Sequence, residues 1–216
     1  MQDSFVHKGK RKILVEYLRE KIGISDENVL KAINEVPRHL FLESVFEDFA
    51  YEDRAFPILA KQTISHPSTV AEQTELLEVQ EKEKILEIGT GCGYQTAVLV
   101  NMNAFVYTVE RQKDLHDFAQ KKLREMHLRP KFHSFGDGFL GLPTFAPFDK
   151  ILVTCGAEIL PIELLKQLKI GGKMVIPMGK TDEQILYRFT KISEKEFEKE
   201  EFGAYKFVPM LQDRNK

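Results

Sequence analysis

Residues 84–97 read KILEIGTGCGYQTA, and this stretch decides the fold. It opens with the short apolar run of a strand, passes through a loop with Gly89, Gly91 and Gly93, and closes on residues that begin a helix. Glycines in such a loop permit a tight turn and a close approach of the backbone to a ligand. The stretch therefore predicts a strand, a ligand-binding loop and a helix in succession.

Two phosphate-binding motifs fit this loop poorly. The dinucleotide fingerprint G-x-G-x-x-G needs its third glycine at position 94, where the chain has Tyr94. A Walker loop needs a lysine directly after its last glycine, and none follows here. The hypothesis that the loop binds a nicotinamide dinucleotide is thereby weakened, and the hypothesis that it is a Walker phosphate-binding loop is excluded.

Strand-like and helix-like segments alternate through the middle of the chain. One helix is expected through Leu76 and Leu77, with Thr69 and Glu72 as its capping box, and another over 112–126. Strands are expected at 84–88, 105–109, 131–133, 150–153 and 173–176. This order predicts an α/β fold with a mostly parallel sheet, helices on both faces, and ligands beyond the carboxyl ends of the strands.

An N-terminal helical extension precedes this core. Apolar spacing predicts a first helix that Gly23 ends, and a second that Ser25 or Asp26 caps and that stops before Pro37. Periodicity fades over 37–67, and a long irregular segment in a compact chain is more often functional than idle.

The C-terminal part predicts antiparallel strands. QILYRFTKI (184–192) and AYKFVPM (204–210) have strand patterns, and the charged stretch between them, SEKEFEKEEFG (193–203), is typical of a solvated hairpin loop. The chain is thus expected to form one domain over residues 1–216.

The composition limits the kinds of binding partner and the cellular compartment that we expect. Lys and Arg number 31 against 33 Asp and Glu, a net charge of -2, so no global field would hold nucleic acid or an anionic membrane. Only Cys92 and Cys155 are present, which argues against a secreted disulfide framework. The basic N-terminus lacks a following apolar run of signal-peptide or membrane-spanning length. We expect a cytoplasmic monomer that binds neither nucleic acid nor membrane.

Two further candidate cofactor-binding residues, both acidic, follow the glycine loop. FVYTVER (105–111) ends a strand with Glu110, whose carboxylate is suited to accept both hydroxyls of a ribose. Asp137 stands between Gly136 and Gly138, where it is either a turn-former or a group that reads an adenine amino group. With Glu87 before the loop, these residues in this order resemble the cofactor site of class I methyltransferases.

A wider set of segments resembles one family, protein-L-isoaspartate O-methyltransferase, over nearly the whole chain. They are VPRHLF (36–41), AYEDRAFPI (50–58), QTIS (62–65), EIGTGCGYQTA (87–97), VYTVER (106–111), GDG (136–138), APFDKILVT (146–154), LKQLKIGGKMVIPMG (165–179) and KFVPM (206–210). The chain departs from the family at Leu59, Ala60 and Lys61, where small residues are usual, and at Ala55, Phe56 and Cys92.

The resemblance implies a Rossmann-like class I fold and an activity. The enzyme would transfer a methyl group from S-adenosylmethionine, leaving S-adenosylhomocysteine, to the α-carboxylate of L-isoaspartyl residues in age-damaged proteins, which starts their repair. The same resemblance implies three parts of the chain: N-terminal helices with the substrate-binding segment (1–67), the cofactor-binding core (68–179) and the C-terminal strands (180–216).

The same resemblance assigns the site residues, without a metal. Ser65 would be catalytic. Substrate would be bound by Thr63, Ile64, Ser65, Phe207 and Val208. The cofactor would be bound by Glu87, Gly89, Thr90, Gly91, Gly93, Glu110, Arg111, Asp137 and Gly138.

The chemistry explains why no catalytic dyad stands out. A carboxylate with an ordinary pKa near 4 is already ionised at neutral pH, so methyl transfer needs alignment and dehydration rather than a general base. A neutral donor such as Ser65 orients the carboxylate without fully neutralising it. Neither cysteine is expected to be needed. The alternatives are a class I methyltransferase for a small molecule or RNA, and a cofactor-binding scaffold that has lost activity.

Overall fold

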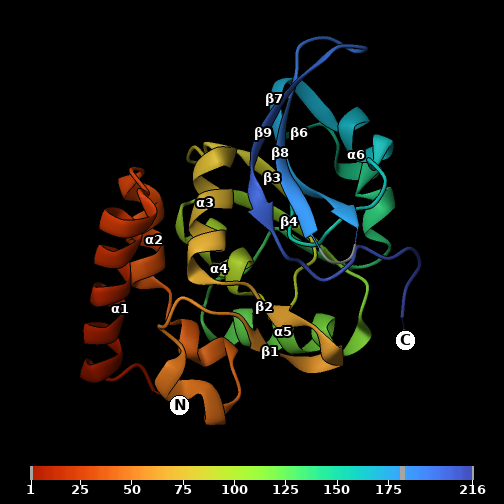
Figure 1. Cartoon of the computed structure of the whole chain (residues 1–216). Coiled ribbons are helices and arrows are strands. Elements are labelled where there is room, and N and C mark those ends of the chain that lie inside the picture. Colours follow the sequence, from red (N-terminus) through yellow and green to blue (C-terminus); the bar gives the residue numbers. More distant parts are fainter. Residues whose placement is uncertain (1, 181–182, 216) are drawn as a thin grey trace.

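The protein, described here by a computed structural model over residues 2–180 and 183–215, is built on a seven-stranded sheet with the order β5-β4-β3-β6-β7-β8-β9 (Figure 1). Strands β3 to β7 run parallel, and β8 and β9 add antiparallel to β7. The strands are β3 Lys84–Ile88, β4 Phe105–Glu110, β5 Phe132–Phe135, β6 Phe148–Val153, β7 Leu168–Lys180, β8 Glu183–Lys191 and β9 Phe197–Tyr205. The predicted α/β fold with a mostly parallel sheet and antiparallel C-terminal strands is confirmed.

Apolar side chains alternate between the two faces of this sheet. Ile85 and Leu152 belong to a core that includes the N-terminal helices, whereas Leu86 and Ile151 belong to a second core on the opposite face. Both faces are therefore covered. The helices along the core are α3 Pro67–Leu77, α4 Tyr94–Asn101, α5 Lys113–Glu125 and α6 Ile162–Lys166.

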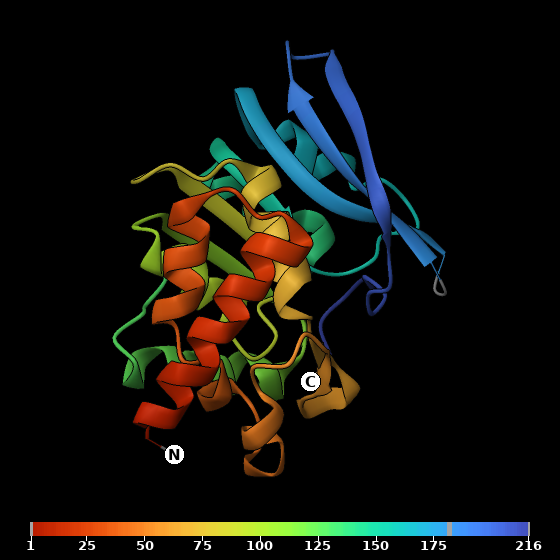
Figure 2. The same ribbon diagram turned by 60° about the vertical axis from the view of Figure 1, so that its left-hand side comes forward.

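The N-terminal extension packs as a pair of helices beside α3 and α4 (Figures 1 and 2). Helix α1 (Phe5–Tyr17) continues into a π-helical turn, η1 (Leu18–Ile22), which Gly23 ends in the left-handed region at φ 91°. Helix α2 (Glu27–Glu35) is capped by Asp26, whose side chain accepts the backbone N–H of Asn28 and Val29. Both predicted helices and their end signals are confirmed.

Residues between α2 and α3 form short pieces rather than long elements. They are the 3-10 turns η2 (Arg38–Phe41), η3 (Ser44–Phe49) and η4 (Leu59–Lys61), and the antiparallel strands β1 (Phe56–Pro57) and β2 (Thr63–Ile64). Ala60 and Lys61 lie at φ 54° and 56°, a region that favours glycine. This backbone explains why glycine suits the position before QTIS, and it shows that the loop also forms with Ala60 and Lys61 there.

Two local predictions were wrong. Helix α3 begins at Pro67, a residue suited to the first helical position, and so Thr69 lies buried inside the first turn instead of capping it with Glu72. The charged stretch 193–203 is not simply a loop, because most of it lies in β9, while 206–210 leaves the sheet. Strand β9 is at the edge of the sheet, where charged side chains are tolerated. One of them, Glu200, forms an ion pair with Arg188 on β8, with 2.6 Å between Oε2 and Nε.

Among the described residues, none of the helices combines the length and the apolar character that crossing a membrane requires.

Candidate active site

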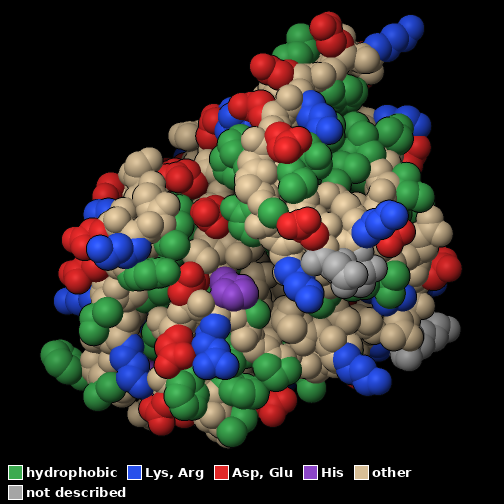
Figure 3. Space-filling model, viewed as in Figure 1, with side chains coloured by type: hydrophobic (Ala, Val, Ile, Leu, Met, Phe, Trp, Pro, Cys, Tyr) green, Lys and Arg blue, Asp and Glu red, His purple; other side chains and the backbone are tan. Residues whose placement is uncertain are grey.

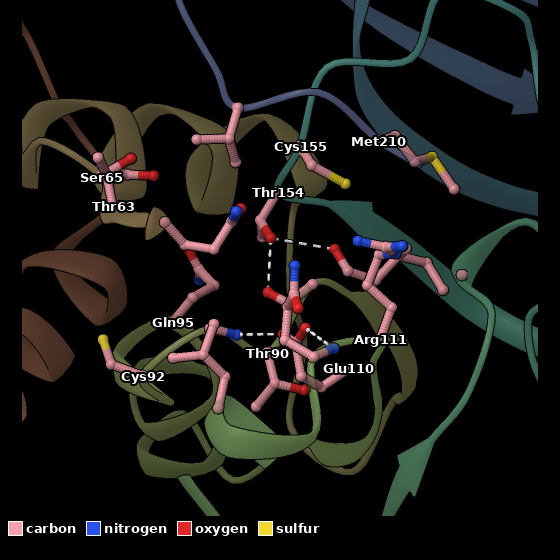
Figure 4. A pocket seen from close by; sticks show the side chains of 18 of the residues that line it. Thr63, Ser65, Thr90, Cys92, Gln95, Glu110, Arg111, Thr154, Cys155 and Met210 are labelled. Atoms are coloured by element: carbon pink, nitrogen blue, oxygen red, sulfur yellow. Dashed lines mark hydrogen bonds between the residues drawn. The ribbon is translucent and has the colours of Figure 1, made fainter. Parts of the chain in front are cut away.

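A cavity opens at the carboxyl ends of β3, β4 and β6, as the strand order predicts (Figures 3 and 4). Its empty volume is roughly 970 Å³, with the open solvent at its mouth included. The QTIS segment, the glycine loop, the ends of β4 and β6 and the C-terminal tail line it, together with residues of α3, α4 and α5 and with Gly138. The cavity is hence assembled from parts that are distant in sequence.

The glycine loop adopts a backbone that side chains rarely allow. Gly89, Gly91 and Gly93 have φ values of 93°, 56° and 93°. A Cβ on Gly89 would lie 2.5 Å from Thr154 Oγ1, and the Thr154 hydroxyl is hydrogen-bonded to the Gly89 carbonyl at 2.6 Å. Gly89, Thr90 and Gly91 line the cavity, whereas Gly93 packs against Leu123 outside it.

Glu110 braces this loop from the end of β4. Its Oε2 accepts the N–H of Gly91 at 2.8 Å, and its Oε1 accepts the N–H of Gln112 at 2.8 Å. The side chain is almost completely buried, and this burial raises the pKa of its carboxyl. Because each carboxylate oxygen can accept a second hydrogen bond, Glu110 can still bind two hydroxyl groups in the cavity.

Glu87 lies beneath the loop and does not line the cavity. Its Oε2 is hydrogen-bonded to Thr96 Oγ1 on α4 at 2.5 Å, and its buried Oε1 has no hydrogen-bond partner among the described residues. Burial raises the pKa of Glu87 from 4.5 to about 7. The geometry favours support of the loop over the direct cofactor contact expected from the sequence.

Replacement of Glu87 by glutamine should change how stability depends on pH. Below pH 4.5 Glu87 is protonated in both the folded and the unfolded chain; between pH 4.5 and 7 the unfolded chain ionises first, so the wild type loses stability as pH rises. Glu87→Gln removes this loss. Its free energy of unfolding relative to wild type should grow across that window by an amount on the order of 3 kcal/mol.

Denaturant unfolding of both proteins at pH 5 and pH 8 checks this. Burial lowers the pKa of His39 and of His133 to about 4, so their contribution is complete above pH 6.5 and is lost as pH falls towards 4. The two histidines are present in both proteins, and the comparison cancels their effect. A stability difference that does not change with pH would contradict a buried, protonated Glu87.

Asp137 and Arg111 hold the C-terminal tail. Asp137 Oδ1 accepts the N–H of Phe139 at 2.8 Å and its Oδ2 accepts the N–H of Asp213 at 2.9 Å. Arg111 Nε donates to the Asp213 carbonyl at 3.1 Å, and its Nη2 donates to that of Gln212 at 3.3 Å. Arg111 lines the cavity and Asp137 does not, while neighbouring Gly138 does. The tail is therefore fixed across the cavity by residues that were assigned to the cofactor.

The expected substrate residues are only partly brought together. Thr63, Ile64 and Ser65 line the cavity, and Figure 4 shows Thr63 and Ser65 side by side, across the cavity from Glu110 and Arg111. Val208 in the tail also lines it. Phe207 is buried outside the lining, and its N–H donates to Gln184 Oε1 at 2.7 Å. Phe207 thus packs in the fold and does not line the cavity.

Several lining residues were missed by the sequence analysis. Thr154 follows β6, the strand beside β3, and the carboxyl-end rule applied to that strand would have found it. The buried Gln95 on α4 carried no such signal; its Nε2 donates to Thr74 Oγ1 at 3.0 Å, and its Oε1 lacks a partner among the described residues. The others include Gln62, Gln73, Gln112 and Met210.

The fold and the cavity together define the class of protein. The glycine loop after β3 and the acidic end of the adjacent β4 meet at one edge of a parallel sheet that continues into antiparallel strands. This is the arrangement of a class I methyltransferase. The chain belongs, within that class, to the protein-L-isoaspartate(D-aspartate) O-methyltransferase family, whose model matches residues 9–215.

Comparison with individual proteins agrees with this assignment. A protein-L-isoaspartate O-methyltransferase of Christiangramia forsetii is 55% identical over 215 residues, which cover 100% of both chains. A solved structure called protein-L-isoaspartate O-methyltransferase superposes with a TM-score of 0.83 at 29% identity, over 92% of this chain and 65% of that longer one. A putative enzyme of this name from Plasmodium falciparum, in complex with S-adenosyl-L-homocysteine, gives a TM-score of 0.82 at 25% identity, with coverage of 94% and 99%. The family resemblance of the sequence is confirmed.

Proposed function

We propose that this chain transfers a methyl group from S-adenosylmethionine to the α-carboxylate of L-isoaspartyl residues in age-damaged proteins and peptides. The observation that carries the proposal is the placement of the neutral hydroxyl of Ser65 across the cavity from the Glu110-braced glycine loop. Family membership and the full-length relative named for this activity support it.

The groups that line the cavity suit the cofactor. Glu110 retains acceptor capacity for the two ribose hydroxyls. The glycine backbone permits close contact by the methionine part of the molecule. When bound, S-adenosylmethionine supplies an electrophilic methyl group on a positively charged sulfur.

The residues of this chain then align the carboxylate and exclude water. The substrate carboxylate is already ionised at neutral pH, so no side chain has to remove a proton. The Ser65 hydroxyl donates a hydrogen bond that directs one carboxylate oxygen to the methyl group, and Thr63 and Ile64 shape the adjacent peptide site. The tail from Val208 to Leu211 keeps water out of the cavity, which strengthens the attraction between the two opposite charges.

The compartment, the oligomeric state and the roles of the parts of the chain belong to the same proposal. The enzyme acts as a cytoplasmic monomer with one domain, in which residues 1–67 serve the substrate and 68–179 the cofactor. Binding of nucleic acid is not part of it, because the net charge is -2 and acidic and basic side chains are interspersed on the face seen in Figure 3.

A pair of peptides tests the activity. The peptides differ only in a normal aspartyl or an L-isoaspartyl linkage at one position, and the transfer of labelled methyl from S-adenosylmethionine is counted. We expect incorporation into the isoaspartyl peptide alone, because that linkage adds a methylene to the backbone and attaches the free carboxylate directly to the main-chain Cα. The normal linkage carries its carboxylate one methylene farther out, on the side chain. Equal methylation of both peptides, or of neither, would overturn the proposal. RNA and small carboxylic acids are assayed as acceptors in the same way, to test the alternative that the enzyme methylates RNA or a small molecule.

A further inference from the structure

Arg38 is a buried cation that makes no ion pair with the residues described. Its side chain is completely buried at the start of η2. Among the residues that the structure describes, Arg38 makes no ion pair within 4.0 Å, Asp53 acts on its charge only from a longer distance, and its Nη1 finds no acceptor. Burial lowers the pKa of Arg38, but an arginine stays charged at neutral pH. Such a charge is costly to bury, so the position requires something that an apolar residue could not provide.

What Arg38 contacts is the backbone of the substrate-side segment. Its Nε donates to the carbonyl of Ala50 at 3.0 Å, and its Nη2 donates to the carbonyls of Arg54 at 3.2 Å and Ser65 at 2.8 Å. Hydrogen bonds from a charged donor are stronger than neutral ones. One planar guanidinium thus holds the chain at three points, of which the last is the backbone of Ser65.

The same side chain also contacts the cofactor side. The guanidinium carbon of Arg38 lies 5.0 Å from the centre of the Tyr94 ring, within the range of a cation–π interaction. Tyr94 is buried, follows Gly93 at the start of α4, and lines the cavity. Arg38 therefore connects Ser65 with the helix that leaves the glycine loop, although it does not itself line the cavity.

We propose that Arg38 is a positioning residue for methyl transfer, which sets the backbone of Ser65 at a fixed place relative to the glycine loop. The proposal rests on the function proposed above for Ser65. Without the guanidinium, the Ser65 carbonyl loses its donor, and the segment moves to find water. Since a displacement of about 1 Å can cost about 10²-fold in rate, the effect should fall on turnover.

Three variants and a double-mutant cycle test this. Arg38→Met removes the charge and all three contacts, and Arg38→Lys keeps the charge without the planar fork. Arg54→Met is the matched control, because it removes an exposed charge from the same segment. For each, kcat and KM on the isoaspartyl peptide, the affinity for S-adenosylhomocysteine and the Tm are measured, alone and combined with Ser65→Ala.

We expect Arg38→Met to lower kcat by roughly tenfold or more, Arg38→Lys by less, and Arg54→Met hardly at all. If Arg38 acts through Ser65, adding Arg38→Met to Ser65→Ala should cost little further turnover, whereas a residue that only stabilises the fold would change Tm and leave kcat unaffected. If Arg38→Met does not fold, Arg38→Lys enters the same cycle.

The outcomes separate the two proposals. Single losses that multiply in the double variant would overturn the positioning role of Arg38 and leave Ser65 in place. A change confined to Tm, or to S-adenosylhomocysteine affinity, would do the same. Full turnover of Ser65→Ala alone would overturn the proposed role of Ser65 and that of Arg38 with it.

Discussion

Ser65→Ala should lower kcat on an isoaspartyl peptide by roughly 10- to 100-fold and leave the affinity for S-adenosylhomocysteine nearly unchanged. The hydroxyl lies on the side of the cavity opposite Glu110, so its removal affects the alignment of the carboxylate and not the cofactor contacts. Steady-state kinetics with the isoaspartyl peptide gives kcat, and calorimetric titration of S-adenosylhomocysteine gives the affinity.

Ser68→Ala is the matched control for this prediction. Ser68 carries the same hydroxyl in the first turn of α3 and does not line the cavity. Its replacement should leave both kcat and cofactor affinity close to wild type. If Ser65→Ala keeps full turnover, or if it weakens the cofactor as much as it slows transfer, Ser65 does not act on the substrate carboxylate.

Glu110→Ala should weaken the binding of S-adenosylhomocysteine by about 10²-fold or more. The change removes the acceptor that we propose for two ribose hydroxyls, and it also leaves the N–H groups of Gly91 and Gln112 without the carboxylate that accepts them. Loss of the brace loosens the glycine loop, so the effect should exceed that of one hydrogen bond. Calorimetric titration gives the affinity directly.

Glu81→Ala removes an exposed carboxylate before β3 and controls for the change in net charge. Glu110→Gln is an informative companion, because its amide still accepts through one oxygen and should retain part of the affinity. Unchanged affinity in Glu110→Ala would place the cofactor elsewhere. Asp137→Ala, by contrast, is expected to act through the tail residue Asp213, since the carboxylate of Asp137 does not line the cavity.

Much of the core could be predicted from the sequence because its signals are local. The strand at 84–88 is bounded as predicted, and the strands at 105–110 and 148–153 differ from prediction by one or two residues. The predictions failed where two local patterns competed. Pro67 begins helix α3 two residues before the predicted capping box, so that box does not form. The edge position of β9 allowed a charged stretch to pair as a strand.

The sequence by itself determined the fold class and the family, because alternating segments and family-like motifs extend over nearly the whole chain. It also predicted the glycine loop, Glu110 and Ser65 as site residues from short local motifs, and all three line the cavity. Only the tertiary structure decided that Glu87 lies under the loop, that Asp137 and Arg111 fix the C-terminal tail, and that Arg38 holds Ser65. Arg38 and Ser65 are 27 positions apart, and Asp137 and Asp213 are 76 apart. Contacts over such separations arise from the packing of several elements, and no local pattern records which groups face a cavity.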